Sequence, residues 1–175
     1  MLKTPAPPSS AETGAHGLDS VLFREGMSRV AAAVHVVTTD GPSGLAGFTA
    51  TAVTPVTDDP ASLLVCVNTA ARSAQALLAN GVFCVNVLNA SDRDLADVFA
   101  GRTDLQGPDR FSKGEWDKLV TGAPALATSL VSFDCRLSDA RVVATHHVII
   151  GEILTIRLGE IRPALVYQRR LYHEL

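Results

Sequence analysis

Much of this chain alternates between apolar and polar positions, which is the period of a β-strand with one packed face and one open face. The alternation is clearest over residues 45–68. Hydroxyl residues alternate there with apolar ones, an Asp-Asp-Pro turn follows, and a second apolar run completes the segment. We therefore predict a strand pair formed by Leu45–Val56 and Leu63–Asn68. Its open face carries threonine and alanine, and would be a flat floor with accessible backbone amides.

Further strands and a few short helices are predicted on both sides of this pair, from β-branched runs, helical spacing and capping residues. Strands are expected at Val34–Thr39, Val82–Leu88, Ser129–Leu137, Val142–Ile156 (with a bend) and Ala164–Gln168. Helices are expected at Leu18–Val30, Ala71–Ala79 and Ser91–Ala100. The polar, glycine-containing segment Gln106–Gly122 is predicted to be a surface loop of functional length. Residues 1–17, rich in Pro, Ser, Ala and Gly, are predicted to be a disordered tail.

This order of elements predicts a mainly β fold, a β-barrel with flanking helices. Strands outnumber helices and turns join many neighbouring strands, which favours a barrel over a doubly wound parallel sheet. The 175 residues form one domain, placed at residues 18–175, because chains divide only above roughly 250–300 residues. A Rossmann fold is excluded, since no Gly-x-Gly-x-x-Gly follows the first strand and no Walker-type loop is present.

Charge and cysteine content limit the partners and the cellular compartment that we expect for the protein. The net charge of −3 gives no electrostatic reason to expect nucleic acid or an anionic membrane as a partner. The three cysteines each stand in an apolar run, as buried structural thiols do, and this favours a reducing cytoplasm. The N-terminus lacks the apolar core of a signal peptide, and no run approaches the ~20 apolar residues of a membrane span. We expect a soluble, cytoplasmic protein.

A candidate anion site lies where the second strand of the predicted pair leads into a helix. Arg72 and Ser73 stand at the start of that helix. Helix starts bind phosphate through free amides and the positive end of the dipole, and arginine adds a forked donor. With the flat floor beside it, this pattern suits a planar ring system that carries a phosphate tail. The competing interpretation is a capped surface helix with a solvated arginine.

Eight sequence blocks together resemble one known family. They are FREGMSRVAAAVHVVTT, GFTATAVTPVTDDP, LLVCVN followed by AARS, FCVNVL, DRFSKGEW, LVSFDCRL, THHVIIGEI and LVYQRRLYHEL. In this order they are similar to the flavin reductases that serve two-component monooxygenases, and most of all to the branch that contains the pyrimidine-utilisation flavin reductases and the corrin reductases. The resemblance covers the chain from Phe23 to the C-terminus. It implies an FMN-binding split barrel.

The resemblance also implies a set of flavin-binding residues. The GFTATA block would contact the flavin ring and ribityl chain, the LLVCVN strand would lie near the ring edge, and AARS would take the phosphate. The helix end and loop that follow residue 99 would overlie the flavin and the nicotinamide, and a tyrosine near the C-terminus would contact either the flavin or the dimer interface. The implied residues are Thr49, Ala50, Thr51, Ala52, Cys66, Asn68, Ala71, Arg72, Ser73, Gly101, Arg110, Phe111 and Tyr167.

One histidine is the candidate catalytic residue. His146 aligns with the family histidine that faces the nicotinamide site and usually follows Gly-Asp. Here Ala144 and Thr145 stand in place of that pair. His147 would point to the opposite face of the same strand, where a structural role is expected. No arrangement of cysteine and histidine suggests a metal site.

The resemblance implies a homodimeric, six-stranded split barrel that binds FMN or FAD between its subunits. It would transfer hydride from NADH or NADPH to the flavin and supply reduced flavin to a partner monooxygenase. Three alternatives stay open: a reductase that keeps its flavin and reduces another acceptor such as a corrin, a non-catalytic flavin-binding module, and an oxidase of the pyridoxamine-phosphate type. The missing Gly-Asp pair favours the non-catalytic module, whereas the oxidase would need a more basic substrate pocket.

Overall fold

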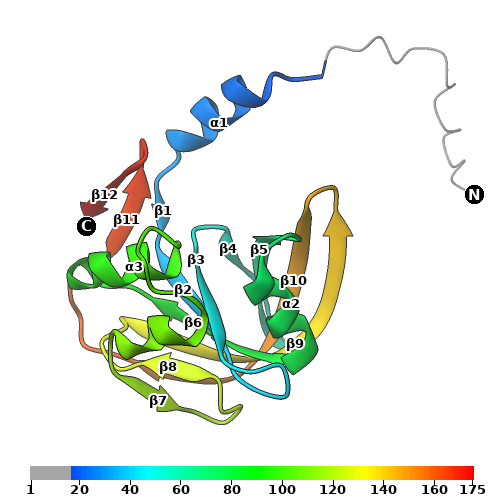
Figure 1. Ribbon diagram of the computed structural model, residues 1–175, viewed down its shortest axis with the longest axis vertical. Coiled ribbons are helices and arrows are strands. Elements are labelled where there is room, and N and C mark those ends of the chain that lie inside the picture. Colours follow the sequence, from blue (N-terminus) through cyan, green and yellow to red (C-terminus); the bar gives the residue numbers. More distant parts are fainter. Residues whose placement is uncertain (1–16) are drawn as a thin grey trace, which may run out of the picture.

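Within residues 17–175, which the computed structural model describes, a curled sheet of seven antiparallel strands forms the body of the protein (Figure 1). The strand order is β3-β2-β6-β9-β10-β5-β4. The predicted tail lies, except for Gly17, outside the described residues. The strands are β2 (His35–Thr39), β3 (Ala46–Ala50), β4 (Val53–Asp58), β5 (Ala61–Asn68), β6 (Val82–Val87), β9 (Val131–Val143) and β10 (His146–Leu158).

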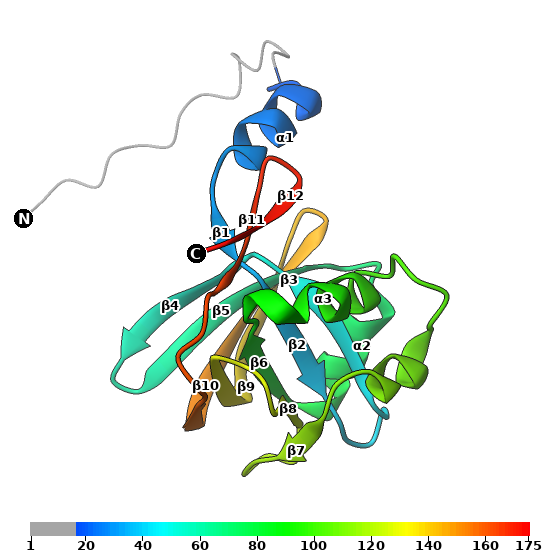
Figure 2. The same ribbon diagram turned by 90° about the vertical axis from the view of Figure 1, so that its left-hand side faces the viewer.

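The single strand predicted over Leu45–Val56 is in fact two strands, and this part of the prediction is wrong. β3 pairs with β2 at one edge of the sheet, whereas β4 pairs with β5 at the other edge. The chain crosses from edge to edge at Thr51 and Ala52, and the Cys66 amide donates to the Ala52 carbonyl at 3.0 Å. The sheet curls so that its two edges meet at this crossing (Figure 2). The predicted six-stranded barrel therefore contains seven strands.

Two smaller sheets are added to this body. A three-stranded sheet of β1 (Ala32–Ala33), β11 (Leu165–Gln168) and β12 (Leu171–Glu174) brings the C-terminus beside the start of the barrel. The segment predicted to be a loop over Gln106–Gly122 instead contains a 3₁₀ helix, η2, and a strand, β7, that pairs with β8. Their bounds are η2 (Gly107–Ser112), β7 (Trp116–Lys118) and β8 (Pro124–Leu126).

The helices lie outside the barrel. α2 (Arg72–Asn80) and α3 (Arg93–Phe99) pack on either side of β3, and α1 (Ser20–Ser28) extends away from the body (Figure 1). The helix predicted from Ser91 begins as a 3₁₀ turn, η1 (Ala90–Asp92), because the Asn89 side chain accepts the Ser91 amide there. No helix among the described residues is long and apolar enough to cross a membrane.

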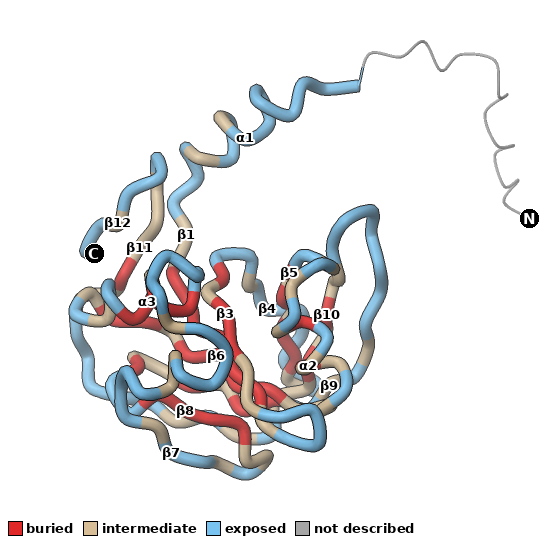
Figure 3. The backbone as a smooth tube through the Cα atoms, in the orientation of Figure 1, coloured by how far each residue is buried: buried red, intermediate tan, exposed pale blue. Residues whose placement is uncertain are grey.

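The core has two main parts, one inside the barrel and one between the sheet and α3 (Figure 3). Inside the barrel, Val65, Phe83 and Ile149 are fully buried. A Cβ at Gly151 of β10 would overlap the ring of Phe83 of β6, so a glycine is needed where this ring packs on the β10 backbone. Buried aliphatic and aromatic surface of this kind is the main source of stability in a domain of this size.

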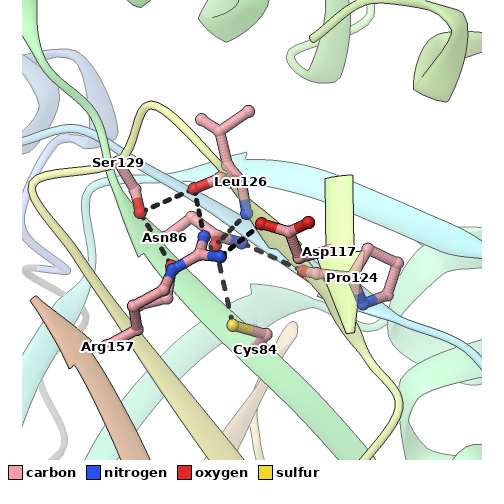
Figure 4. Close-up of polar contacts among 8 residues, drawn as sticks. Cys84, Asn86, Asp117, Pro124, Leu126, Ser129 and Arg157 are labelled. Carbon is pink, nitrogen blue, oxygen red and sulfur yellow. Dashed lines mark hydrogen bonds and ion pairs between the residues drawn. The ribbon is translucent and has the colours of Figure 1, made fainter. Parts of the chain in front are cut away.

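A buried amide ties β6, β8 and β9 together (Figure 4). Asn86 is fully buried; its Nδ2 donates to the Val36 carbonyl at 3.1 Å. Its Oδ1 accepts from the Leu126 amide at 2.8 Å and from the Ser132 hydroxyl at 2.9 Å. Burial raises the pKa of the neighbouring Cys84 thiol to about 12, in keeping with the predicted structural role of that cysteine. This network holds β8 against the barrel.

Candidate functional site

An open cavity of about 910 Å³ lies against β3, between the start of α2 and the end of α3. Strand β3 and the crossing after it form the floor, and the end of β5 and η2 complete the wall. The lining residues predicted from the sequence are Thr49, Ala50, Thr51, Ala52, Cys66, Asn68, Ala71, Arg72, Ser73, Gly101, Arg110 and His146. The structure thus brings together residues from five separate segments of the chain.

The floor is flat because its residues are small and one of them is glycine. A Cβ at Gly47 would come within 2.8 Å of the Phe99 ring and 3.1 Å of the Val37 carbonyl oxygen. Glycine therefore lets the end of α3 pack directly on β3. The Thr49 hydroxyl donates to the Ala96 carbonyl at 2.7 Å, which fixes the last turn of α3 to the same strand. The hydroxyl predicted to face the flavin is thus also an anchor for α3.

The start of α2 presents unused donors to the cavity. Ala71 precedes the helix in an extended conformation and makes no side-chain capping bond. Among the described residues, no partner accepts from the backbone amides of Arg72 and Ser73, and the exposed Arg72 guanidinium forms no ion pair. Asn68 shapes the approach, since its Oδ1 accepts the Ala70 amide at 2.8 Å. Free amides and a free guanidinium at a helix start are the elements of an anion site.

The opposite wall carries a second guanidinium. Arg110 is half-buried and its Nε donates to the Leu105 carbonyl at 3.3 Å. Gly101 ends α3 with a φ of +74°, and a Cβ there would lie 3.4 Å from Arg110 Nη2. A glycine at this position therefore allows the left-handed turn, and the Arg110 guanidinium lies next to it.

His146 stands at the open end of the cavity. It is exposed and pairs with Asn68 across the β10–β5 ladder. Its Nδ1 lies 3.0 Å from the Thr145 hydroxyl, and the Thr145 carbonyl accepts the Thr69 amide at 3.0 Å. Thr145, which stands where the family usually has aspartate, thus makes a side-chain contact with His146. His147 is not among the lining residues.

The cavity is basic. Its charged lining residues within the described chain are Arg72 and Arg110, and none of its lining residues is a carboxylate. Such a surface favours an anionic ligand, and the small apolar floor favours a flat one. The predicted combination of planar ring and phosphate tail therefore matches the cavity in both shape and charge.

Two predicted residues lie outside the lining. The Phe111 ring packs edge-on against Phe99 with centroids 5.0 Å apart and against Trp116 at 5.1 Å, so it supports the wall from behind. Tyr167 packs on Tyr172 in the C-terminal hairpin, with centroids 5.2 Å apart. Both rings pack against the second part of the core, between the sheet and α3. They therefore lie behind the cavity wall and not in it.

Several lining residues were not predicted. They come from turns and helix positions that carry no periodic or motif signal, and their place follows only from the way the chain folds back on β3. Ser43 and Leu45 come from the DGPSG segment and the residue after it, a composition that indicates a turn and not a site. The residues from turns and helix positions are Ser43, Leu45, Ala76, Ala100, Gln106 and Gly107. The lining also includes Ala46, Gly47, Phe48, Val67 and Phe99, which lie in predicted strands or at the end of a predicted helix but were not among the predicted site residues.

The family model of the flavin reductase like domain matches residues 27–175. The chain belongs to this family. The prediction of the family and of the split-barrel fold is therefore confirmed. FMN reductase (NADH) RutF of Stutzerimonas stutzeri is 48% identical over 153 residues, which cover 87% of each chain.

Solved structures of family members have the same fold. BorF, the flavin reductase component of a bacterial two-component tryptophan halogenase, is 35% identical with a TM-score of 0.83, over 90% of this chain and 98% of BorF. The NADH:FAD oxidoreductase SgcE6 of Streptomyces globisporus, in complex with NAD and FAD fragments, is 27% identical with a TM-score of 0.81, over 90% of this chain and 93% of SgcE6.

Proposed function

We propose that this flavin reductase is an NADH-dependent FMN reductase that supplies reduced flavin to a two-component monooxygenase. The observation that carries the proposal is the cavity itself, in which a floor of small residues meets a guanidinium and helix amides that have no partner among residues 17–175. The relatives support the same assignment, since RutF is an NADH-dependent FMN reductase and BorF serves a two-component enzyme.

The residues of the cavity fit FMN. Arg72 and the amides of Arg72 and Ser73 would hold the phosphate, while the floor from Thr49 to Ala52 would lie against the ring and ribityl chain. When bound, the flavin accepts a hydride from the nicotinamide, which is the chemistry of the cofactor and not of any side chain. The protein has to bind and orient the two rings and keep water away from them. This explains a site without a cluster of acid and base groups.

The open shape of the cavity suits a flavin that arrives and leaves. The reductases that feed a separate oxygenase must release reduced flavin, and a site closed on all sides would prevent this. FMN is the expected flavin, since RutF relatives are FMN reductases, whereas SgcE6 uses FAD. Steady-state oxidation of NADH and NADPH with each flavin tests this choice: the highest kcat/KM is expected for NADH with FMN, and equal rates without added flavin would contradict the proposal.

His146→Ala is expected to raise the KM for NADH by about 5- to 10-fold, with little change in FMN affinity. The reason is that His146 is an exposed residue of the cavity lining and that the family resemblance places it at the nicotinamide site. Steady-state kinetics at saturating FMN measures the effect, and His147→Ala is the matched control on the same strand. An unchanged KM for NADH in the His146 variant would remove this residue from the nicotinamide site.

Of the three alternatives, a non-catalytic flavin-binding module has the most support from the sequence. Ala144 and Thr145 replace the Gly-Asp pair before His146, so that the histidine loses its usual carboxylate neighbour. The Thr145 hydroxyl, 3.0 Å from His146 Nδ1, supplies a polar partner in its place. FMN binding without any reduction by NADH would favour the module.

The homodimer is also part of the proposal, and α1 supplies its support. This helix buries none of its residues in the chain and exposes apolar side chains, including Phe23 at 56% and Leu22 at 61% (Figure 3). The outer face of β10 adds Ile156 and Leu158 as exposed apolar residues. Exposed apolar surface on this scale marks an interface. We place a second copy of this chain on it, because the family that the chain resembles binds flavin between the subunits of a homodimer.

Phe23→Glu is expected to convert the dimer to a monomer, since a carboxylate in a buried apolar interface is not solvated. Light scattering coupled to size-exclusion chromatography measures the mass, and Ser20→Glu on the same helix is the charge-matched control. The fold of each chain should remain intact, because Phe23 makes no contact with the core. A wild-type protein that is monomeric at micromolar concentration would contradict the dimer.

A cytoplasmic location remains part of the proposal. All three cysteines are free, and burial raises the pKa of both Cys84 and Cys135, so these two thiols are inert structural groups. Free thiols of this kind are typical of a reducing compartment. NADH is also supplied there.

A further inference from the structure

A cluster of polar and aromatic side chains joins the C-terminal hairpin to the end of α3, and nothing proposed above uses it. Tyr167 and Tyr172 face each other across β11 and β12. The Tyr172 hydroxyl donates to Asp97 Oδ1 at 3.1 Å, and Arg102 Nη1 donates to the same oxygen at 2.8 Å. The first of these contacts joins residues 75 positions apart in the sequence.

This cluster has more contacts than an isolated surface ion pair, which by itself contributes little. The Arg102 guanidinium carbon lies 5.7 Å from the Tyr172 ring centre and 5.9 Å from that of Tyr167. The Arg93 guanidinium lies 5.6 Å from the Tyr172 ring centre. Burial and the Asp97 carboxylate raise the pKa of Tyr172 to about 12, so the phenol stays protonated and remains a donor.

The cluster stands directly behind the cavity. Asp97 and Arg102 flank the segment Phe99–Gly101, which we call the rim segment and whose three residues all line the cavity. The Arg102 amide donates to the Asp97 carbonyl at 3.0 Å, so that the last turn of α3 closes around the rim segment. On its other side, α3 is attached to β3 through the Thr49 hydroxyl.

The end of α3 is therefore held from two sides. β3 holds it from the floor, and the C-terminal hairpin holds it from outside the cavity. The rim segment lies next to Arg110: a Cβ added at Gly101 would be 3.4 Å from Arg110 Nη2. Loss of the Tyr172 contact would therefore loosen the rim segment and, through it, the position of the Arg110 side chain in the cavity wall.

We propose that Tyr172 is a positioning residue that acts through Asp97 to fix the rim segment and the Arg110 guanidinium at the cavity. Tyr172 does not line the cavity and would not touch a ligand there. The identity of that ligand as FMN rests on the proposed function, whereas the link between hairpin and rim rests on the contacts above.

The first test is hydrogen–deuterium exchange of the ligand-free Tyr172→Phe protein. This variant keeps the ring and its packing and removes only the hydroxyl. Amides over residues 96–102 are expected to exchange about tenfold faster than in the wild type, while those of β6 and β9 are unchanged. FMN titration, followed by flavin fluorescence, should show a Kd raised about fivefold.

Two further variants separate positioning from general stability. Arg170→Asn removes the contact of the same hairpin with Glu25 of α1 and should leave the rim exchange unchanged, since asparagine tolerates the φ of +64° at that position. Asp97→Ala removes the acceptor of the Tyr172 hydroxyl and should accelerate rim exchange at least as much as Tyr172→Phe, since it also removes the Arg102 contact. Adding Tyr172→Phe to Asp97→Ala should change rim exchange little further, because the Tyr172 hydroxyl acts through this carboxylate.

A Tyr172→Phe protein with a lower melting temperature but wild-type exchange at the rim segment and wild-type FMN affinity would overturn the proposal. So would an equal effect of Arg170→Asn on rim exchange. A wild-type protein that binds no FMN would contradict the proposed function instead, and the exchange measurement would still decide the role of Tyr172.

Discussion

Replacing Arg72 by alanine is expected to weaken FMN binding by roughly 10- to 100-fold, since charge-assisted bonds from arginine to phosphate are among the strongest polar contacts in proteins. The guanidinium lies at the start of α2 with no ion-pair partner among the described residues, so its charge is available to a ligand. Turnover at saturating FMN should change less than about threefold, because the phosphate is remote from the reacting ring.

Fluorescence titration of FMN measures the affinity of the Arg72→Ala protein. Arg72→Lys should lose only part of the affinity, since lysine keeps the charge without the forked donor. Arg162→Ala is the matched control, because this exposed arginine is paired with Glu160 and does not line the cavity. Equal FMN affinity in the Arg72→Ala and wild-type proteins would place the phosphate elsewhere.

Asn86→Ala is expected to lower the free energy of unfolding by about 3–4 kcal/mol, the largest stability effect that we predict. The substitution leaves the buried Leu126 amide and the Ser132 hydroxyl without the acceptor that Asn86 Oδ1 supplies. Unsatisfied buried polar groups cost more than the net value of the bonds they lose. The melting temperature should fall by about 10 °C.

Urea and thermal unfolding of the flavin-free protein measure this effect. Asn80→Ala is the matched control, because this side chain is only half-buried and makes three hydrogen bonds, two to the turn at Ser43 and Gly44 and one to the Thr39 hydroxyl. Its expected cost is about 1 kcal/mol. Equal losses for Asn80→Ala and Asn86→Ala would contradict the role given to the buried network.

The anion site was the part of the site most open to prediction from sequence. Helix α2 spans Arg72–Asn80, one residue later at each end than the predicted Ala71–Ala79, so Arg72 and Ser73 stand at its start as predicted. The floor strand was recognised by its alternation, which is a local property of the chain. Both features depend only on residues that are neighbours in the sequence, so they can be predicted without knowledge of the fold.

The misplaced features depend on contacts between distant segments. The division at Thr51 and Ala52 follows from closure of the sheet, which a continuous alternating pattern does not reveal. Strand β12 was missed because its turn is formed by Arg169 and Arg170, both with positive φ, where glycine or asparagine is the usual signal. The packing of Phe111 on Phe99 is likewise set by the fold of the chain around α3.

Anaerobic mixing of the purified protein with FMN and NADH, followed by the long-wavelength flavin absorbance, tests the reductase activity most directly. We expect rapid bleaching that depends on the protein, is faster with NADH than with NADPH, and needs more FMN in the Arg72→Ala variant. FMN that binds but keeps its absorbance with both nicotinamides would contradict the assignment as a flavin reductase.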